Sequence, residues 1–107
     1  MSARRSMIMP VESCKSKKII MNDIRLDPAT VAGYETREQL KRIESMARSL
    51  SEKGQLVPII VNVDLTTIWA GHTRYFAAKK LNWRVIDAIV MNDKEWNAYI
   101  MSNGAQI

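Results

Sequence analysis

Residues 56–81 read LVPIIVNVDLTTIWAGHTRYFAAKKL, and this stretch decides the fold. Its first part, Leu56–Val63, is short, rich in β-branched residues and nearly all apolar, which predicts a buried strand. Pro58 lacks a backbone N–H, so it is confined to the start of that strand or to a bulge. A turn at residues 64–66 and a second short strand, Thr67–Ala70, then predict a β-hairpin.

The second part of this stretch predicts a helix. Gly71 ends the strand, and Thr73–Leu81 follows as a helical run whose inward residues are predicted to be Phe76, Ala77 and Leu81. Asn82 stands just past its end, where a left-handed residue often closes a helix.

The clearest helix of the chain precedes this stretch, at Thr36–Lys53. Thr36 with Gln39 three places on forms a capping box. Gly54 stands just past the last residue, where a left-handed C-terminal cap is expected. Helical spacing predicts one apolar face made of Leu40, Ile43, Ala47 and Leu50, with Met46 at its edge.

The outer parts of the chain complete a small α+β pattern. Lys18–Arg25 predicts a first strand, residues 28–36 a loop broken by Gly33, and Arg84–Val90 another strand. Asn92 or Asp93 is expected to cap a last helix that runs through Met101. The order strand, helix, hairpin, helix, strand, helix predicts one small α+β domain, with a mixed sheet flanked by about three helices.

The basic charge of the protein is concentrated at its N-terminus. The 107 residues carry a net charge of +5, and the first 18 supply +4 of it, from Arg4, Arg5, Lys15, Lys17 and Lys18 against one glutamate. Residues 1–16 are polar and lack periodicity, so we predict a flexible basic tail at 1–16 and a domain at 17–107. Two interpretations of the tail stay open: contact with a polyanion such as nucleic acid, or a solubilising start.

The composition also indicates the compartment. Cys14 is the single cysteine, so no internal disulfide is possible, and a reducing cytoplasm is expected. No apolar run approaches the roughly 18 residues of a membrane span, so no membrane partner is expected.

Gly71-His72-Thr73-Arg74 is the candidate site. The first amides of a helix have no partner within the helix, and the helix dipole adds positive potential there, so such a turn suits an anion. Glycine lets a ligand approach the backbone, Thr73 can cap the helix or donate to phosphate, and Arg74 offers a two-pronged donor. His72 can donate a hydrogen bond or carry a proton. The alternative is an ordinary helix cap with no ligand.

Two motifs in this region resemble the ParB/sulfiredoxin superfamily, specifically ParB-like N-terminal domains. The family shows S-I-x-x-x-G-x-x-x-P-I-x-V followed by I-x-x-G-x-x-R-x-x-A-A-x-x-L-G. Here the motifs are carried by Ser49, Leu50, Gly54, Pro58, Ile59 and Val61, then by Ile68, Gly71, Arg74, Ala77, Ala78 and Leu81. Asn82 replaces the final Gly, and Ala98, Tyr99 and Asn103 match the family's last helix. The G-H-x-R version is similar to stand-alone ParB-like nuclease domains of phages and mobile elements.

The resemblance implies roles for individual residues. Gly71, His72, Thr73 and Arg74 would contact the phosphates of a nucleotide or of DNA. Gly54 and Gln55 would lie across the pocket, and Asn103 would lie near the phosphates or a metal. The implied ligand is CTP or ATP with Mg²⁺, and the implied macromolecular partner is DNA.

The chain also departs from the family pattern. Sulfiredoxins place a catalytic cysteine directly before the His-Arg pair, whereas Gly71 stands there in this chain, so thiol repair is not expected. The third family box is reduced to residues 102–106, which weakens the case for strong binding of triphosphate and Mg²⁺. The helix-turn-helix and dimerisation domains of partitioning ParB proteins do not follow within the 107 residues.

Several other residues are weaker candidates. Glu52 or His72 is a candidate catalytic base, and Lys79 and Lys80 can extend a phosphate track. Asp64, Asp87 and Asp93 are candidate Mg²⁺ ligands, although no clear metal set is formed. The tryptophans at 69, 83 and 96 can stack bases, but we expect Trp69 in the core and Trp83 packed on Trp96.

Three functions therefore stay open. The first is a DNA-associated regulatory module that binds nucleotide phosphates or DNA backbone. The second is an enzyme, either a DNA nuclease or a nucleotide hydrolase or phosphotransferase. The third is a mobile-element protein that inhibits a host protein. A homodimer is possible in each case.

Overall fold

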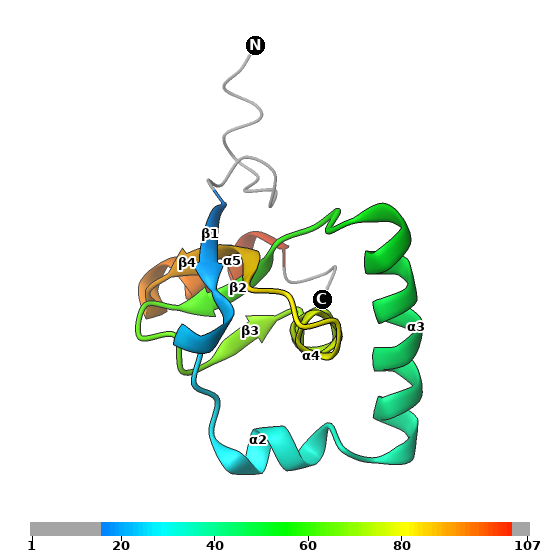
Figure 1. Cartoon of the computed structure of the whole chain (residues 1–107). Helices are drawn as coiled ribbons and strands as arrows, with labels where there is room; N and C mark the ends of the chain where they lie inside the picture. Colours follow the sequence, from blue (N-terminus) through cyan, green and yellow to red (C-terminus); the bar gives the residue numbers. More distant parts are fainter. Residues whose placement is uncertain (1–15, 104–107) are drawn as a thin grey trace.

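The computed structural model describes residues 16–103, without the side chain of Asn103. Figure 1 shows the sheet and the helices around it. In chain order the elements are β1 (Lys17–Ile20), the 3-10 turn η2 (Met21–Asp23), α2 (Pro28–Gly33), α3 (Arg37–Lys53), β2 (Ile59–Asn62), β3 (Ile68–Ala70), α4 (His72–Lys80), β4 (Val85–Met91) and α5 (Asp93–Asn103). The predicted small α+β domain with a mixed sheet is confirmed.

The strands form one sheet in the order β1-β4-β2-β3. The inner pair, β2 and β4, is parallel, with Ile59 opposite Ala88 and Val61 opposite Val90. Both outer strands are antiparallel to their neighbours. The predicted hairpin is the β2–β3 pair, and its turn is held by Asn62, whose Oδ1 accepts from the amides of Thr66 and Thr67.

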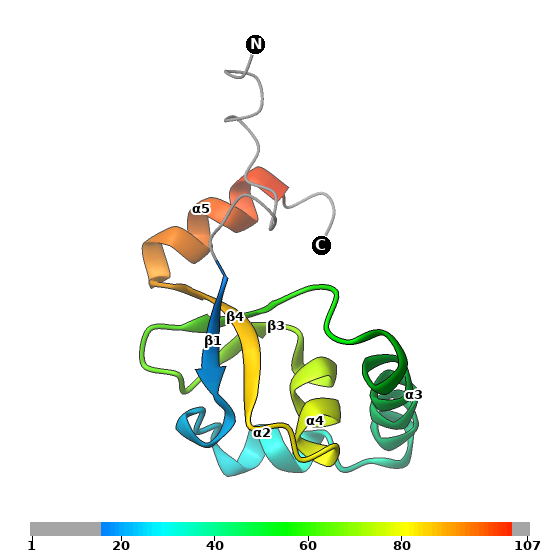
Figure 2. The same cartoon turned by 45° about the horizontal axis from the view of Figure 1, so that its top comes forward.

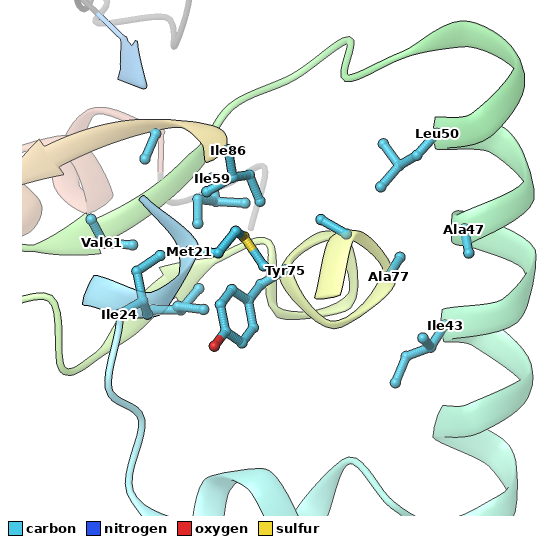
Figure 3. Packing of buried hydrophobic residues seen from close by; sticks show 13 residues of the cluster. Met21, Ile24, Ile43, Ala47, Leu50, Ile59, Val61, Tyr75, Ala77 and Ile86 are labelled. Atoms are coloured by element: carbon cyan, nitrogen blue, oxygen red, sulfur yellow. The ribbon is translucent and has the colours of Figure 1, made fainter. Parts of the chain in front are cut away.

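Helices α4 and α3 form two layers on one face of the sheet, with α4 between the sheet and α3 (Figure 1). Side chains from the sheet, from α4 and from α3 meet in one core, which Figure 3 shows in close-up. Ile59, Val61, Ala77 and Ala78 are fully buried in it. The small Ala77 and Ala78 let α4 lie close to both of its neighbours, because a larger side chain would hold the layers apart.

The opposite face of the sheet is covered in part by α5, which lies away from α3 and α4 (Figure 2). Ile60, Ile89 and Met91 form a second buried cluster there, packed by Trp96 and Tyr99 of α5. Trp96 stacks on Trp69 of β3 with ring centroids 5.2 Å apart. The predicted Trp83–Trp96 contact was therefore wrong, since Trp83 packs against the larger core on the other face.

The predicted helix caps are confirmed at several points. The Thr36 hydroxyl accepts from the Gln39 amide at 3.3 Å, which is one half of the predicted capping box. Helix α3 ends at Gly54 as expected, but the ψ of −174° beside its φ of 75° differs from the predicted left-handed cap. Asn82 closes α4 with φ of 60°. Asn92 begins α5, and its side chain accepts from the Glu95 amide at 2.7 Å while Glu95 accepts in return at 2.8 Å.

Three local predictions were wrong. Residues 28–33 form α2 instead of a loop, because the Asp27 carboxylate caps the helix by accepting from the Thr30 amide at 2.7 Å and Pro28 fits its first turn. That hydrogen bond also holds the pKa of Asp27 below its ordinary value. The first strand ends at Ile20, where the chain turns into η2 and buries Met21. Leu40 is 51% exposed, since α4 covers only the faces of α3 that carry Ile43, Ala47 and Leu50.

Helices that could cross a membrane were searched for within residues 16–103, and no such helix was found.

Candidate functional site

The candidate site is the sharp turn between β3 and α4. Gly71 is the N-terminal cap of α4 and has left-handed backbone angles, φ 98° and ψ 26°. A Cβ atom at this position would lie 2.7 Å from Cγ2 of Ile59. Both the backbone angle and the close approach to β2 therefore require glycine here.

The turn holds the first amides of α4, which precede the hydrogen bonds of the helix. The first hydrogen bond of α4 runs from the Tyr75 amide to the Gly71 carbonyl at 3.0 Å. The amides of His72, Thr73 and Arg74 precede that bond and have no carbonyl within the helix to pair with. The predicted capping by Thr73 is not observed, because α4 begins at His72 and no side chain bonds at its cap. The three amides lie at the positive end of the helix dipole, a position that suits an anion.

His72 is held against an aromatic ring. Its imidazole stacks on Tyr34 with ring centroids 5.1 Å apart and planes 10° apart, and the other partner of Tyr34 is Phe76 at 5.0 Å. His72 is partly buried, and this burial lowers its pKa. At neutral pH the ring is therefore uncharged, with one N–H donor and one acceptor nitrogen. The sequence analysis did not identify Tyr34 as a site residue. The available signal was an aromatic side chain two positions before the helix cap at Thr36, which indicates packing against a neighbouring element.

Arg74 supplies the positive charge of the turn. It is partly buried, and within residues 16–103 no ion pair involves its guanidinium. A guanidinium with five donors and no carboxylate partner favours a phosphate ligand beside the free amides.

The side chain of Gln55 links the end of α3 to the sheet through hydrogen bonds. Its Nε2 donates to the carbonyls of Asp87 at 2.9 Å and Val57 at 3.1 Å, and its Oε1 accepts from the Asp87 amide at 2.8 Å. These bonds occupy its amide group, and they fix the Gly54–Val57 linker to β4. The role of Gly54 and Gln55 in nucleotide contact stays a prediction.

The remaining predicted site residues are spread over the domain. Glu52 is exposed in the last turn of α3, and Lys79 and Lys80 are exposed at the opposite end of α4 from the turn. Lys17 and Lys18 lie on β1, where Lys18 pairs with Asp87 at 2.9 Å. Asp64 and Asp93 are exposed, and no group of three His, Cys, Asp or Glu side chains within residues 16–103 is placed to hold a metal. Arg4, Arg5, Lys15 and the Asn103 side chain lie outside the part that the structure describes.

Comparison with known proteins identifies relatives of this architecture. The sequence profile of the ParB N-terminal domain matches residues 10–104. One similar solved structure is the C-terminally truncated chromosome-partitioning protein ParB from Caulobacter crescentus complexed with CTP-gamma-S. It has a TM-score of 0.62 and 19% identity, and the match covers 87% of this chain and 53% of that one. A Pnob8-like ParB-N domain has a TM-score of 0.59 and 18% identity, over 86% of this chain and 37% of the other.

Sulfiredoxin from Arabidopsis thaliana is also similar, with a TM-score of 0.60 and 23% identity over 81% of this chain and 97% of that protein. This chain therefore spans about half of the truncated Caulobacter protein, but nearly all of the sulfiredoxin. The search of curated proteins found no match. At these identities the structural likeness shows a shared fold.

Proposed function

This chain belongs to the ParB N-terminal domain family, and on that premise we propose that it binds the phosphates of a nucleoside triphosphate at the N-terminus of α4. The observation that carries the proposal is the turn at Gly71, where α4 begins without a side-chain cap and the amides of His72, Thr73 and Arg74 precede the first hydrogen bond of the helix. The ParB structure complexed with CTP-gamma-S supports it, because that protein shares the fold. We expect CTP or ATP to be the ligand.

Each residue of the turn has a distinct role in this proposal. The amides of His72 and Thr73 would bind one phosphate group at the positive end of the helix. Arg74 would contact a second phosphate through a two-pronged donor. The neutral His72 ring, fixed by Tyr34, would donate its single N–H without bringing a second charge.

Mg²⁺ would bind mainly through the phosphate oxygens of the nucleotide. Mg²⁺ commonly takes one or two carboxylates and keeps several waters. This mode fits residues 16–103, which offer no cluster of three candidate ligand side chains.

DNA is the macromolecular partner in this proposal. A net charge of +5, with most of the excess in the first 18 residues, supports salt-sensitive contact with DNA backbone. The protein would then act as a DNA-associated regulator, in the cytoplasm and as a possible homodimer.

The lowered pKa of His72 supports a second candidate function, hydrolysis of the bound nucleotide. An uncharged imidazole at neutral pH is in the form that accepts a proton from water. Release of inorganic phosphate from CTP or ATP, lost in His72→Gln, would establish this activity. A protein that binds nucleotide with no phosphate release would be a binding module.

Calorimetric titration with CTP, ATP and ADP, with and without Mg²⁺, tests the binding site. Loss of one charge-assisted contact costs about 1.5–3 kcal/mol, so Arg74→Ala should weaken binding roughly 10- to 150-fold. Arg84→Ala is the matched control, since Arg84 is an exposed arginine just beyond the other end of α4. Absence of binding to the folded wild-type protein, or equal loss in both variants, would refute the proposal.

A further inference from the structure

A second surface of the domain is an open groove between the end of α2, the first half of α3 and the second half of α4. We call it the α3–α4 groove. Its volume is about 740 Å³, and its apolar lining comes from Val31, Tyr34, Leu40, Ile43 and Phe76. This volume lies in the range of ordinary ligand sites.

The apolar floor of the groove follows the geometry of two helices. On α3 the lining residues include Arg37, Leu40, Lys41 and Glu44, which are spaced by three and four positions and therefore share one side of the helix. Leu40 is the most exposed apolar side chain of this floor, at 51%. Leu40 lies in the first turn of α3, and together with the other apolar lining residues it forms an apolar surface that its own domain leaves open to solvent.

The rim of the groove is basic. Four cations line it, Arg37, Lys41, Lys79 and Lys80, against two acids, Glu35 and Glu44. In the part of the chain that the structure describes, none of the four cations forms an ion pair. Lys79 has one aromatic contact, 5.9 Å from the centre of the Tyr75 ring. The groove therefore combines an apolar floor with a rim on which cations outnumber acids by four to two.

We propose that the α3–α4 groove binds an acidic amphipathic helix of a partner protein. Such a helix places apolar side chains on the floor and carboxylates along the rim. The lining of α3 from residue 37 to 44 extends about 10 Å, so the groove fits about two turns of helix. This inference goes beyond nucleotide binding, because two of the rim cations lie on α3 and the other two, Lys79 and Lys80, lie at the opposite end of α4 from the phosphate turn.

Two other occupants of the α3–α4 groove, the N-terminal segment of this chain and a second copy of the chain, are disfavoured by their charge. Residues 1–15 of this chain carry three basic residues against one acidic residue, and a second copy of the chain carries +5. The N-terminal segment would meet the rim cations with like charge, and the second copy brings no net negative charge to them. Nucleic acid would satisfy the cations, but its backbone would leave Leu40 and Phe76 without apolar contact.

A designed peptide tests the proposal. The probe has 16 residues, with leucines at helical positions i, i+3, i+4 and i+7 and glutamates on the remaining faces. Two control peptides accompany it: a scramble of the same composition, and a copy in which lysine replaces glutamate. Binding to the full chain is followed by chemical shifts of ¹⁵N-labelled protein, at two salt concentrations.

The expected shifts lie on α3 and α4 around Leu40 and Phe76, for the acidic helix only, and binding weakens with salt. Leu40→Asp and Lys41→Glu should each weaken binding at least about tenfold. Arg42→Glu is the matched control: it makes the same charge change at an exposed neighbour outside the groove, and should bind as the wild type does. Leu40 is half exposed, so its replacement should not unfold the domain, and Lys41→Glu gives an independent test.

Several outcomes would overturn the proposal: no binding of the acidic helix, shifts centred on α5, equal binding of the lysine peptide, or full binding by Leu40→Asp. A DNA duplex that shifts the same residues, with Leu40→Asp unaffected, would assign the cations to nucleic acid instead. CTP and ATP titrations of the same variants keep this result separate from the phosphate site, since Leu40 and Lys41 lie outside the turn.

Discussion

Replacement of Gly71 by alanine should destabilise the domain through two separate effects. The first is conformational, because φ is 98° at Gly71 and left-handed backbone costs an L-residue about 1–2 kcal/mol. The second is steric, since the new Cβ would lie 2.7 Å, 3.0 Å and 3.2 Å from Cγ2, Cβ and Cα of the buried Ile59. Overpacking of this kind costs about 1–3 kcal/mol. The expected loss is therefore roughly 2–5 kcal/mol, a large part of the 5–15 kcal/mol typical of a domain.

Urea unfolding followed by tryptophan fluorescence measures this loss. With a urea dependence of about 2 kcal/mol/M, the middle of the typical range, the midpoint should fall by roughly 1–2.5 M. Gly71→Asn separates the two effects, because asparagine tolerates left-handed backbone, as Asn82 does in this chain with φ of 60°. Gly71→Asn should therefore recover only the conformational part of the lost stability and should keep the steric part.

Gly33→Ala is the control, because nothing lies within 4 Å of its added Cβ. It should change stability by less than about 1 kcal/mol. If Gly71→Asn were as stable as the wild type, the close approach to Ile59 would be refuted. If Gly71→Ala matched Gly33→Ala, neither effect would hold.

Three further predictions follow from individual contacts. Gln55→Ala should lower the free energy of unfolding by about 1–3 kcal/mol in urea, because it removes two hydrogen bonds to the Asp87 backbone. An unchanged urea midpoint would contradict a stabilising role for these bonds. Burial lowers the pKa of His72 in the folded protein, so the unfolded chain binds the proton more readily. The wild-type protein should therefore lose stability relative to His72→Gln as the pH falls below about 6.5. A constant difference between pH 8 and pH 5 would show that burial does not perturb His72. Asp27→Ala should lower the urea midpoint and reduce helical circular dichroism by the few residues of α2, because it removes the cap of that helix, and neither change should occur if Pro28 alone starts the helix.

The proposed site and the groove share one structural feature. Tyr34 contacts His72 of the phosphate turn and also lines the α3–α4 groove. Tyr34→Leu should therefore alter both nucleotide and peptide affinity, whereas Arg74→Ala and Lys41→Glu should each alter one. Parallel titrations of the three variants measure whether the two surfaces are independent.

The sequence by itself determined the parts of this protein that depend on near neighbours. The cap at Thr36, the close of α4 at Asn82, the β2–β3 hairpin and the Gly71–Arg74 turn are each set by residues within a few positions, so composition and spacing predicted them. The family resemblance rests on the same local motifs, and residues 10–104 match the family.

The tertiary structure alone decided how distant segments meet. The order β1-β4-β2-β3 brings Gln55 onto Asp87, 32 positions away, and the packing of α2 sets Tyr34 on His72. The coverage of α3 by α4 leaves Leu40 open although its spacing predicts burial. Periodicity shows which side chains share one face of a helix. How much of that face is buried depends on which element packs against it and on how much of the face that element covers, and both are set by the tertiary fold.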